Sequence, residues 1–167
     1  MSLDAPHLAG SVDATGMKIG IIVSRFNADI TEGLLDGALK ALKEHGATDQ
    51  MITIIHVPGA LEIPTIASAM AQTGRYAALV CLGCVIKGDT AHFDHVCRVA
   101  MDSIGHIAEC GDIAIANGIL TVDTHAQAVD RIGGAHGHKG AEAALTAVEI
   151  AALLDVIEGI EGIGEQT

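Results

Sequence analysis

Ala77-Ala-Leu-Val-Cys-Leu-Gly-Cys-Val-Ile86 is a nearly continuous apolar run, and it leads directly into Lys87-Gly-Asp-Thr-Ala-His-Phe-Asp94. A short apolar run bounded by turn residues is typical of a strand that is buried on both faces. We expect this strand over Ala77–Val85, followed by a long helix from about Ala91 to Glu109 that Gly111 closes. The segment therefore predicts one strand-helix unit of an α/β fold.

The same alternation extends along the rest of the chain. Further strands are expected at Lys18–Val23, Met51–Val57 and Asp112–Asn117. The expected helices are one with Ile30, Leu34, Ala38 and Leu42 on its apolar face, one from Pro64 to before Gly74, a short one from Thr124 to near Gly133, and a last one to about Ile157. Strands that alternate with helices predict a parallel sheet with helices on both faces.

Local signals place the helix ends. Asp29 with Glu32, and Thr124 with Gln127, have the spacing of capping boxes, and Gly46 is a helix stop. There is no repeat, low-complexity tract or linker, so we expect one domain over residues 1–167. Residues 1–16 are expected to be a lead-in segment and residues 158–167 a frayed tail.

Composition restricts the partners and the compartment. The formal net charge is −12, which disfavours nucleic acid and anionic membranes, and no apolar run reaches the ~18 residues of a membrane span. Met1–His7 lacks the basic and apolar regions of a signal peptide, so we expect a cytoplasmic protein with reduced thiols. Aromatic residues make up only 2%, so the core is expected to consist of small aliphatic side chains.

Cys81 and Cys84 have the C-x-x-C spacing of zinc and redox sites. Both lie in the predicted strand, where residues three apart face opposite sides of the sheet. No second pair completes a four-thiolate site. Two buried structural thiols are therefore the better interpretation.

The candidate site lies in the loops after the strands, because ligands of open α/β sheets bind beyond the carboxyl ends of the strands. The four loops are expected at residues 24–27, 58–62, 86–90 and 117–121. Phe26, one of only two Phe, could stack on a heteroaromatic ligand, or it could cover the sheet edge. Glu62 could hold a polyol hydroxyl, or it could pair with the start of a helix.

The turn before the long helix is a candidate phosphate site with a candidate proton-transfer residue. Gly88-Asp-Thr90 offers backbone N–H groups at a helix N-terminus, although a plain helix cap explains the same residues. His92 follows at a strand end, where an imidazole can take and return a proton near pH 7. His92 and His95 have a spacing that could ligate a metal, but a third ligand is not obvious.

Two cations stand apart from these loops. Arg131 and Lys139 flank a Gly-rich loop, and within one copy they have no evident reason to meet the strand ends. Across an interface between copies, they could supply positive charge to a phosphate. His136 and His138 lie in the same loop, where a surface loop is a commoner explanation than a metal site.

Five motifs together resemble the lumazine synthase family. They are Ser24-Arg-Phe-Asn27, Val57-Pro-Gly-Ala-Leu-Glu-Ile-Pro64, Gly83-Cys-Val-Ile-Lys-Gly-Asp-Thr-Ala-His-Phe-Asp94, Gly118-Ile-Leu-Thr121 and Lys139-Gly-Ala-Glu-Ala-Ala144. The similarity runs in order from about Lys18 to Leu154, and the third motif is long and specific. It implies a flavodoxin-like three-layer αβα sandwich with a four-stranded parallel sheet.

The resemblance also implies an activity. It is the condensation of 5-amino-6-(D-ribitylamino)uracil with 3,4-dihydroxy-2-butanone 4-phosphate to 6,7-dimethyl-8-ribityllumazine, phosphate and water, without a metal or an organic cofactor. Members of the family are transferases of riboflavin biosynthesis that assemble as pentamers or larger shells, with active sites between subunits. Riboflavin synthase is a candidate partner.

Site residues follow from the resemblance by motif. For the pyrimidine they are Phe26, Ala60, Leu61, Glu62, Cys84, Val85, Ile86 and Asn117, and for the butanone phosphate they are Asp89, Thr90 and a neighbouring subunit's Arg131. Lys87, Gly88 and Lys139 are further candidates, and His92 is implied as the proton-transfer residue.

Three departures from the family pattern affect these expectations. Asn117 stands where an aromatic residue usually closes the pocket, and Leu61 replaces a frequent Phe. The loop Gly133–Lys139 differs from the pattern of shell-forming members. Asn117 keeps open the alternative of a lumazine or flavin carrier, or of a shell protein with weak catalysis. A flavodoxin-like redox protein is a further alternative, which the 2% aromatic content disfavours.

Overall fold

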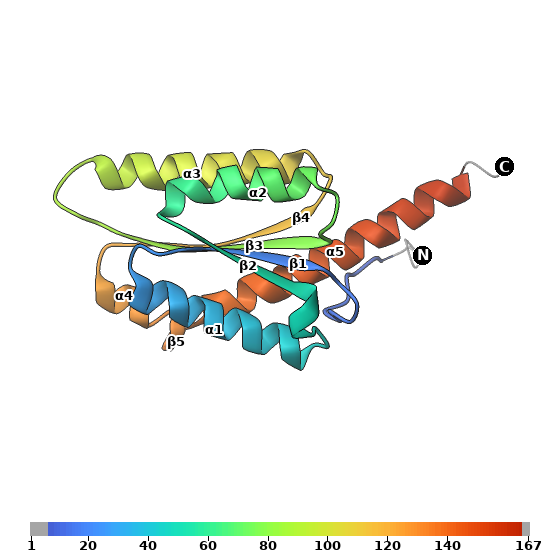
Figure 1. Ribbon diagram of the computed structural model, residues 1–167, viewed down its shortest axis with the longest axis horizontal. Helices are drawn as coiled ribbons and strands as arrows, with labels where there is room; N and C mark the ends of the chain where they lie inside the picture. Colours follow the sequence, from blue (N-terminus) through green and yellow to red (C-terminus); the bar gives the residue numbers. More distant parts are fainter. Residues whose placement is uncertain (1–6, 165–167) are drawn as a thin grey trace, which may run out of the picture.

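A parallel sheet forms the centre of the molecule in the computed structural model, which describes residues 7–164 (Figure 1). The strands are β1 (Ile19–Ser24), β2 (Ile52–Val57), β3 (Ala78–Ile86) and β4 (Ala114–Val122), in the order β2-β1-β3-β4. Each neighbouring pair is parallel, and Ile19 lies opposite Ile52 on one side and Ala78 on the other. The predicted α/β fold is confirmed, and the strand order is that of flavodoxin-like folds.

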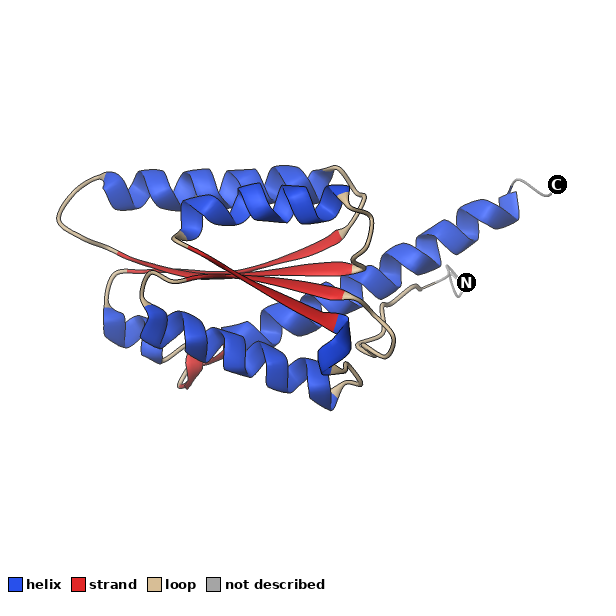
Figure 2. Ribbon diagram, viewed as in Figure 1, coloured by secondary structure: helices blue, strands red, loops and turns tan. Residues whose placement is uncertain are grey.

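Helices cover both faces of this sheet, as the strand-helix alternation predicts. They are α1 (Ala28–Glu44), α2 (Ile63–Gln72), α3 (His92–Glu109), α4 (His125–Val129) and α5 (Lys139–Gly164). Helices α2 and α3 pack together on one face, while α1, α4 and α5 lie on the other (Figure 2). The result is three layers. No helix within residues 7–164 is long and apolar enough to cross a membrane.

Two aliphatic clusters hold the layers together. Ile21 and Val80 point toward α1 and α5, whereas their strand neighbours Ile22 and Leu79 point toward α2 and α3. Side chains alternate in this way because successive residues of a strand face opposite sides. Both faces of the central strands are therefore buried, which explains why their sequences are apolar apart from Ser24 at the end of β1.

The fourth strand corrects the sequence prediction. A strand over Asp112–Asn117 was expected, with a loop at residues 117–121, but β4 continues to Val122. Gly118 lies inside this strand rather than in a turn, and its lack of a side chain is required because Leu82 and Ala143 approach closely. A Cβ atom at this position would lie 2.7 Å from Leu82 Cδ2 and 3.0 Å from Ala143 Cβ. The third and fourth strands thus pair along their whole length.

Helix ends and loops bring further corrections. The capping box at Asp29 and Glu32 is wrong, because Asn27 precedes α1 in a left-handed conformation and no side chain caps the helix. The capping box of Thr124 and Gln127 is confirmed. The frayed tail is wrong for residues 158–164, which continue α5, and residues 165–167 lie outside the described residues.

The lead-in and the Gly-rich loop have different outcomes. Residues 7–16 of the predicted lead-in segment contain no helix or strand, and residues 1–6 lie outside the described part of the chain. The segment expected to be a loop after α4 forms a small antiparallel hairpin of β5 (Ile132–Gly134) and β6 (Gly137–His138). Gly133 and Gly137 have φ values of 104° and 75°, so the hairpin uses conformations that glycine adopts without strain.

Candidate active site

A cavity of about 470 Å³ opens at the carboxyl ends of β1, β2 and β3. The chain runs from β1 outward to β2 and then crosses back to β3 on the other side of β1, so the cavity lies at the point where the strand order reverses. Its lining residues are Phe26, Asn27, Pro58, Gly59, Ala60, Leu61, Glu62, Cys84, Val85, Ile86, His92 and Val96. Eight of the predicted site residues are thereby brought together.

The turn between β1 and α1 presents the ring of Phe26. Its side chain is 73% exposed, although the backbone is held, because the Phe26 N–H donates to Pro58 O at 3.1 Å. An exposed phenyl ring at the mouth of a cavity can stack on a flat heteroaromatic ligand. This arrangement favours the stacking interpretation over the alternative that Phe26 covers the sheet edge.

Asn27 is a residue of this site that the sequence reasoning missed. Its φ of 57° makes it the one non-glycine residue with positive φ in the described chain, and its Nδ2 donates to Cys84 O at 2.9 Å. The bond joins the end of β1 to the end of β3. Asparagine tolerates the left-handed conformation better than other non-glycine residues, so an Asn just before a helix was the available signal.

We expect two substitutions at Asn27 to separate its two contributions. Asn27→Gly keeps the left-handed conformation but loses the bond to Cys84, which lowers the free energy of unfolding by about 1 kcal/mol. Asn27→Ala adds a left-handed strain of a further ~1 kcal/mol. Urea unfolding measures both values, and equal stability of the two variants would show that the turn is not strained.

The turn between β2 and α2 brings a carboxylate to the cavity. Gly59 is extended, and Glu62 Oε2 lies 3.1 Å from the position that a Cβ on Gly59 would take. Glu62 is exposed, so its carboxylate is free to accept hydrogen bonds from a ligand. Ala60 beside it is buried and Leu61 is partly exposed, which gives this wall an apolar surface.

The end of β3 and the start of α3 form the third wall. Cys84 is buried, Val85 and Ile86 are half-buried, and His92 is the first, exposed residue of α3. Val96 lines the cavity one helical turn after His92. This repeat of four positions places both side chains on one face of the helix.

The predicted phosphate turn lies between these walls but does not line the cavity. Residues 87–90 are exposed, and the Thr90 hydroxyl accepts the His92 N–H at 3.4 Å. Lys87 lies near Asp123, with its Nζ 3.7 Å from Oδ1. His95 Nδ1 lies 3.4 Å from Arg98 Nη2. The described residues contain no group of three His, Cys, Asp or Glu side chains that could hold a metal ion.

The cysteine pair faces opposite sides of the sheet, as predicted. Cys81 belongs to the cluster under α2 and α3, and Cys84 belongs to the cluster under α1 and α5. Burial raises the pKa of Cys81 to about 12. Burial, and secondarily the charge of Asp29, raise the pKa of Cys84 to about 11. Both thiols are therefore protonated near neutral pH.

This protonation predicts selective alkylation. A raised pKa leaves almost no thiolate until the pH approaches that value, and the thiolate is the reactive species. Near neutral pH, iodoacetamide is expected to modify the exposed Cys110 of the native protein and to leave Cys81 and Cys84 intact. Peptide mass spectrometry measures the modification, and alkylation of Cys84 as fast as Cys110 would contradict the assignment.

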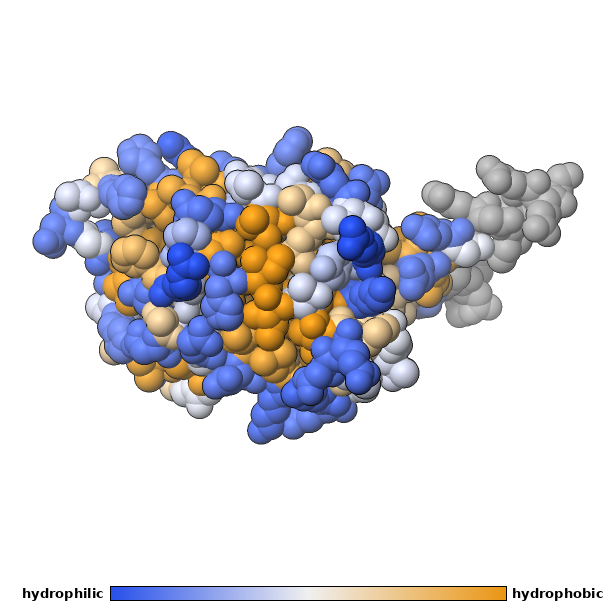
Figure 3. Space-filling model, viewed as in Figure 1, coloured by the Kyte–Doolittle hydropathy of each residue, from blue (hydrophilic) through white to orange (hydrophobic). Residues whose placement is uncertain are grey.

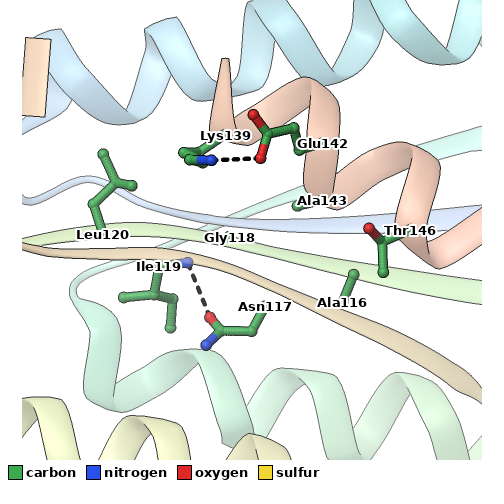
Figure 4. A pocket seen from close by; sticks show the side chains of 9 residues that line it. All are labelled: Ala116, Asn117, Gly118, Ile119, Leu120, Lys139, Glu142, Ala143 and Thr146. Carbon is green, nitrogen blue, oxygen red and sulfur yellow. Dashed lines mark hydrogen bonds and ion pairs between the residues drawn. The ribbon is translucent and has the colours of Figure 1, made fainter. Parts of the chain in front are cut away.

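A second cavity, of about 250 Å³, lies along β4 and the start of α5 (Figure 4). The polar side chains of Lys139, Glu142 and Thr146 line it from the α5 side of the sheet, whereas the Asn117 side chain lies on the opposite side, where its Nδ2 donates to Met101 Sδ at 2.6 Å. Asn117 Oδ1 accepts the Ile119 N–H at 2.9 Å, and Lys139 Nζ pairs with Glu142 Oε2 at 2.6 Å. Asn117, a predicted residue of the pyrimidine site, does not line the cavity with Phe26 within one copy of the chain.

Arg131 lines neither cavity. It follows α4, and its Nη1 donates to Gln127 O at 2.8 Å. The Lys139 N–H donates to Arg131 O at 2.8 Å, so these two cations are neighbours. Two sets of candidate residues can therefore be distinguished within one copy: the eight around the cavity with Phe26 and His92, and Asn117, Arg131 and Lys139, which do not line that cavity. The phosphate turn, residues 87–90, belongs to neither set.

Fold and cavity together define a class of protein. A flavodoxin-like sheet with a ring, a carboxylate and an imidazole around a cavity at its switch point is the architecture of an α/β protein that binds small molecules. The chain matches the family model of 6,7-dimethyl-8-ribityllumazine synthase over residues 16–155, and it belongs to this family. This match confirms the resemblance seen in the sequence. The members of the family are transferases.

Proposed function

We propose that this protein condenses 5-amino-6-(D-ribitylamino)uracil with 3,4-dihydroxy-2-butanone 4-phosphate to give 6,7-dimethyl-8-ribityllumazine, phosphate and water. The family match supports the lumazine product. The observation that carries the proposal is the cavity that combines Phe26, Glu62 and His92. Each of these side chains suits a different part of the reactants.

The pyrimidine occupies the cavity in this proposal. Its ring stacks on Phe26 between the apolar walls of Val85 and Ile86, and Glu62 accepts hydrogen bonds from the ribityl hydroxyls. Ala60 and Leu61 line the same wall. The phosphate of the second substrate lies beside Asp89 and Thr90 at the start of α3, where the positive end of the helix dipole favours an anion.

Each chemical step requires proton movement next to His92. The amine of the pyrimidine adds to the ketone, and a first water leaves as an imine forms. Phosphate then departs by elimination. The second nitrogen attacks the remaining carbonyl carbon and closes the ring with loss of a second water. His92 can take a proton from the attacking amine and return one to a leaving oxygen, because it is exposed at the cavity wall. Most of the rate acceleration comes from holding two substrates together.

A neighbouring copy completes the site in this proposal. Arg131 approaches the phosphate, Lys139 adds positive charge, and Asn117 faces the ring from across the interface. Two observations support it: these residues lie apart from His92 within one copy, and β2 is a sheet edge with an exposed apolar residue, Ile54. Figure 3 shows an apolar band across the face where Figure 1 places β2. We propose a closed pentamer in the cytoplasm.

Product formation tests the reaction. The purified protein is mixed with both substrates, and the fluorescence of the lumazine is followed. Turnover that requires both substrates supports the proposal. Tight binding of lumazine without turnover would instead identify a carrier, the alternative that Asn117 in place of an aromatic residue keeps open.

A further inference from the structure

The β5–β6 hairpin holds the two cations of the second set together. Arg131 and Lys139 are the residues directly outside its two strands, and the Lys139 N–H donates to Arg131 O at 2.8 Å. Within the hairpin, Ile132 lies opposite His138. Because Arg131 precedes Ile132 and Lys139 follows His138 in the chain, a displacement of Ile132 and His138 moves both cations together.

Helix α1 carries a face that fits this hairpin. Gly33 and Gly37 are four residues apart, so they lie on the same side of the helix. A Cβ on Gly33 would lie 2.9 Å from Ile132 Cδ1, and a Cβ on Gly37 would overlap three atoms of the His138 ring. The two hairpin side chains thus rest where the helix has no side chains of its own.

Two further contacts fix the same junction. A Cβ on Gly140 would overlap the backbone carbonyl of Leu34, so the first turn of α5 also lies directly on α1. His138 Nδ1 lies 3.4 Å from the Ala141 N atom in the first turn of α5. The ring of His138 therefore contacts both α1 and α5, and Lys139 follows it directly.

We propose that the Gly33–Gly37 face of α1 and the His138 ring form a positioning element for Arg131 and Lys139. This inference rests on the proposed function, in which the two cations bind the phosphate of the substrate. The element touches no substrate itself. It determines where the guanidinium and the ammonium lie when a neighbouring copy presents its cavity.

Gly37→Ala tests the proposal. Alanine favours a helix more than glycine does, so α1 is expected to form as before, but the new methyl group displaces the His138 ring. We expect the KM for the butanone phosphate to rise about tenfold while the KM for the pyrimidine changes less than twofold, because small displacements of a binding group are costly. Gly33→Ala should have a smaller effect, since the end of Ile132 can move.

The matched control is Gly105→Ala on α3, where the added methyl group meets nothing within 4 Å. It should have the kinetic constants of the unmodified protein. A double-variant comparison adds a second test: once His138→Ala has removed the ring, Gly37→Ala should raise the phosphate KM no further. This second result would not follow from a general loss of stability.

The outcomes separate this inference from the function on which it rests. Absence of product from the unmodified protein would contradict the proposed function itself. An active protein in which Gly37→Ala behaves like Gly105→Ala would overturn the positioning element. An equal rise of both KM values, or an undiminished effect of Gly37→Ala in the His138→Ala background, would overturn it as well.

Discussion

Arg131→Ala is expected to raise the apparent KM for 3,4-dihydroxy-2-butanone 4-phosphate about ten- to a hundredfold. A hydrogen bond between a guanidinium and a phosphate contributes about 1.5–3 kcal/mol, and its loss leaves a dianion with fewer partners. Within one copy, Arg131 Nη1 donates to Gln127 O, which leaves other N–H groups for the substrate of a neighbour. Steady-state kinetics with each substrate varied in turn measures the effect.

Two further variants sharpen this prediction. Arg131→Lys keeps the positive charge but loses the bidentate geometry of the guanidinium. Its KM for the butanone phosphate should therefore lie between those of the unmodified protein and Arg131→Ala. Arg75→Ala is the matched control, because Arg75 is exposed and precedes β3, at the end of the sheet away from the cavity. If Arg131→Ala altered only the KM for the pyrimidine, the phosphate assignment would be wrong.

His92→Ala is expected to slow turnover by roughly ten- to a thousandfold. Proton transfer by a positioned side chain typically accelerates a reaction by about 10²- to 10⁴-fold. Because this reaction depends largely on holding two substrates together, we expect the loss of His92 to reduce the rate by a factor at the lower end of that range or below it. The side chain is exposed at the start of α3, so its removal leaves the fold intact. Single-turnover kinetics separates the chemical step from product release.

His106→Ala is a matched control for this effect. His106 is an exposed histidine of the same helix, and it does not line the cavity with Phe26. Its replacement should leave turnover unchanged. Turnover of His92→Ala at the rate of the unmodified protein would remove His92 from proton transfer.

The fold was largely predictable because the two central strands, β1 and β3, are almost entirely apolar. Ile21, Ile22, Leu79 and Val80 are all fully buried, so these strands stand out from the rest of the sequence. The errors occurred where a tertiary contact overrides a local signal. Gly118 reads as a turn residue until Leu82 and Ala143 are known to crowd it.

The cavity was predictable for a topological reason, and the second set of residues was not. Loops after parallel strands must meet at one edge, so Phe26, Glu62 and His92 could be grouped from the sequence. Asn27 was missed because its contribution depends on a backbone conformation and on a bond to Cys84. Asn117 and Arg131 lie outside the cavity of their own copy, so their contribution depends on an assembly that one chain does not contain.

The central claim is that His92 of one copy and Arg131 of a neighbour serve the same site. Co-expression of His92→Ala chains with Arg131→Ala chains in equal amounts tests it by measuring lumazine formation at subsaturating butanone phosphate. In randomly mixed rings, about one site in four combines an intact cavity with an intact arginine, so about a quarter of the unmodified activity should return. Activity no higher than the mean of the two separate variants would contradict a shared site.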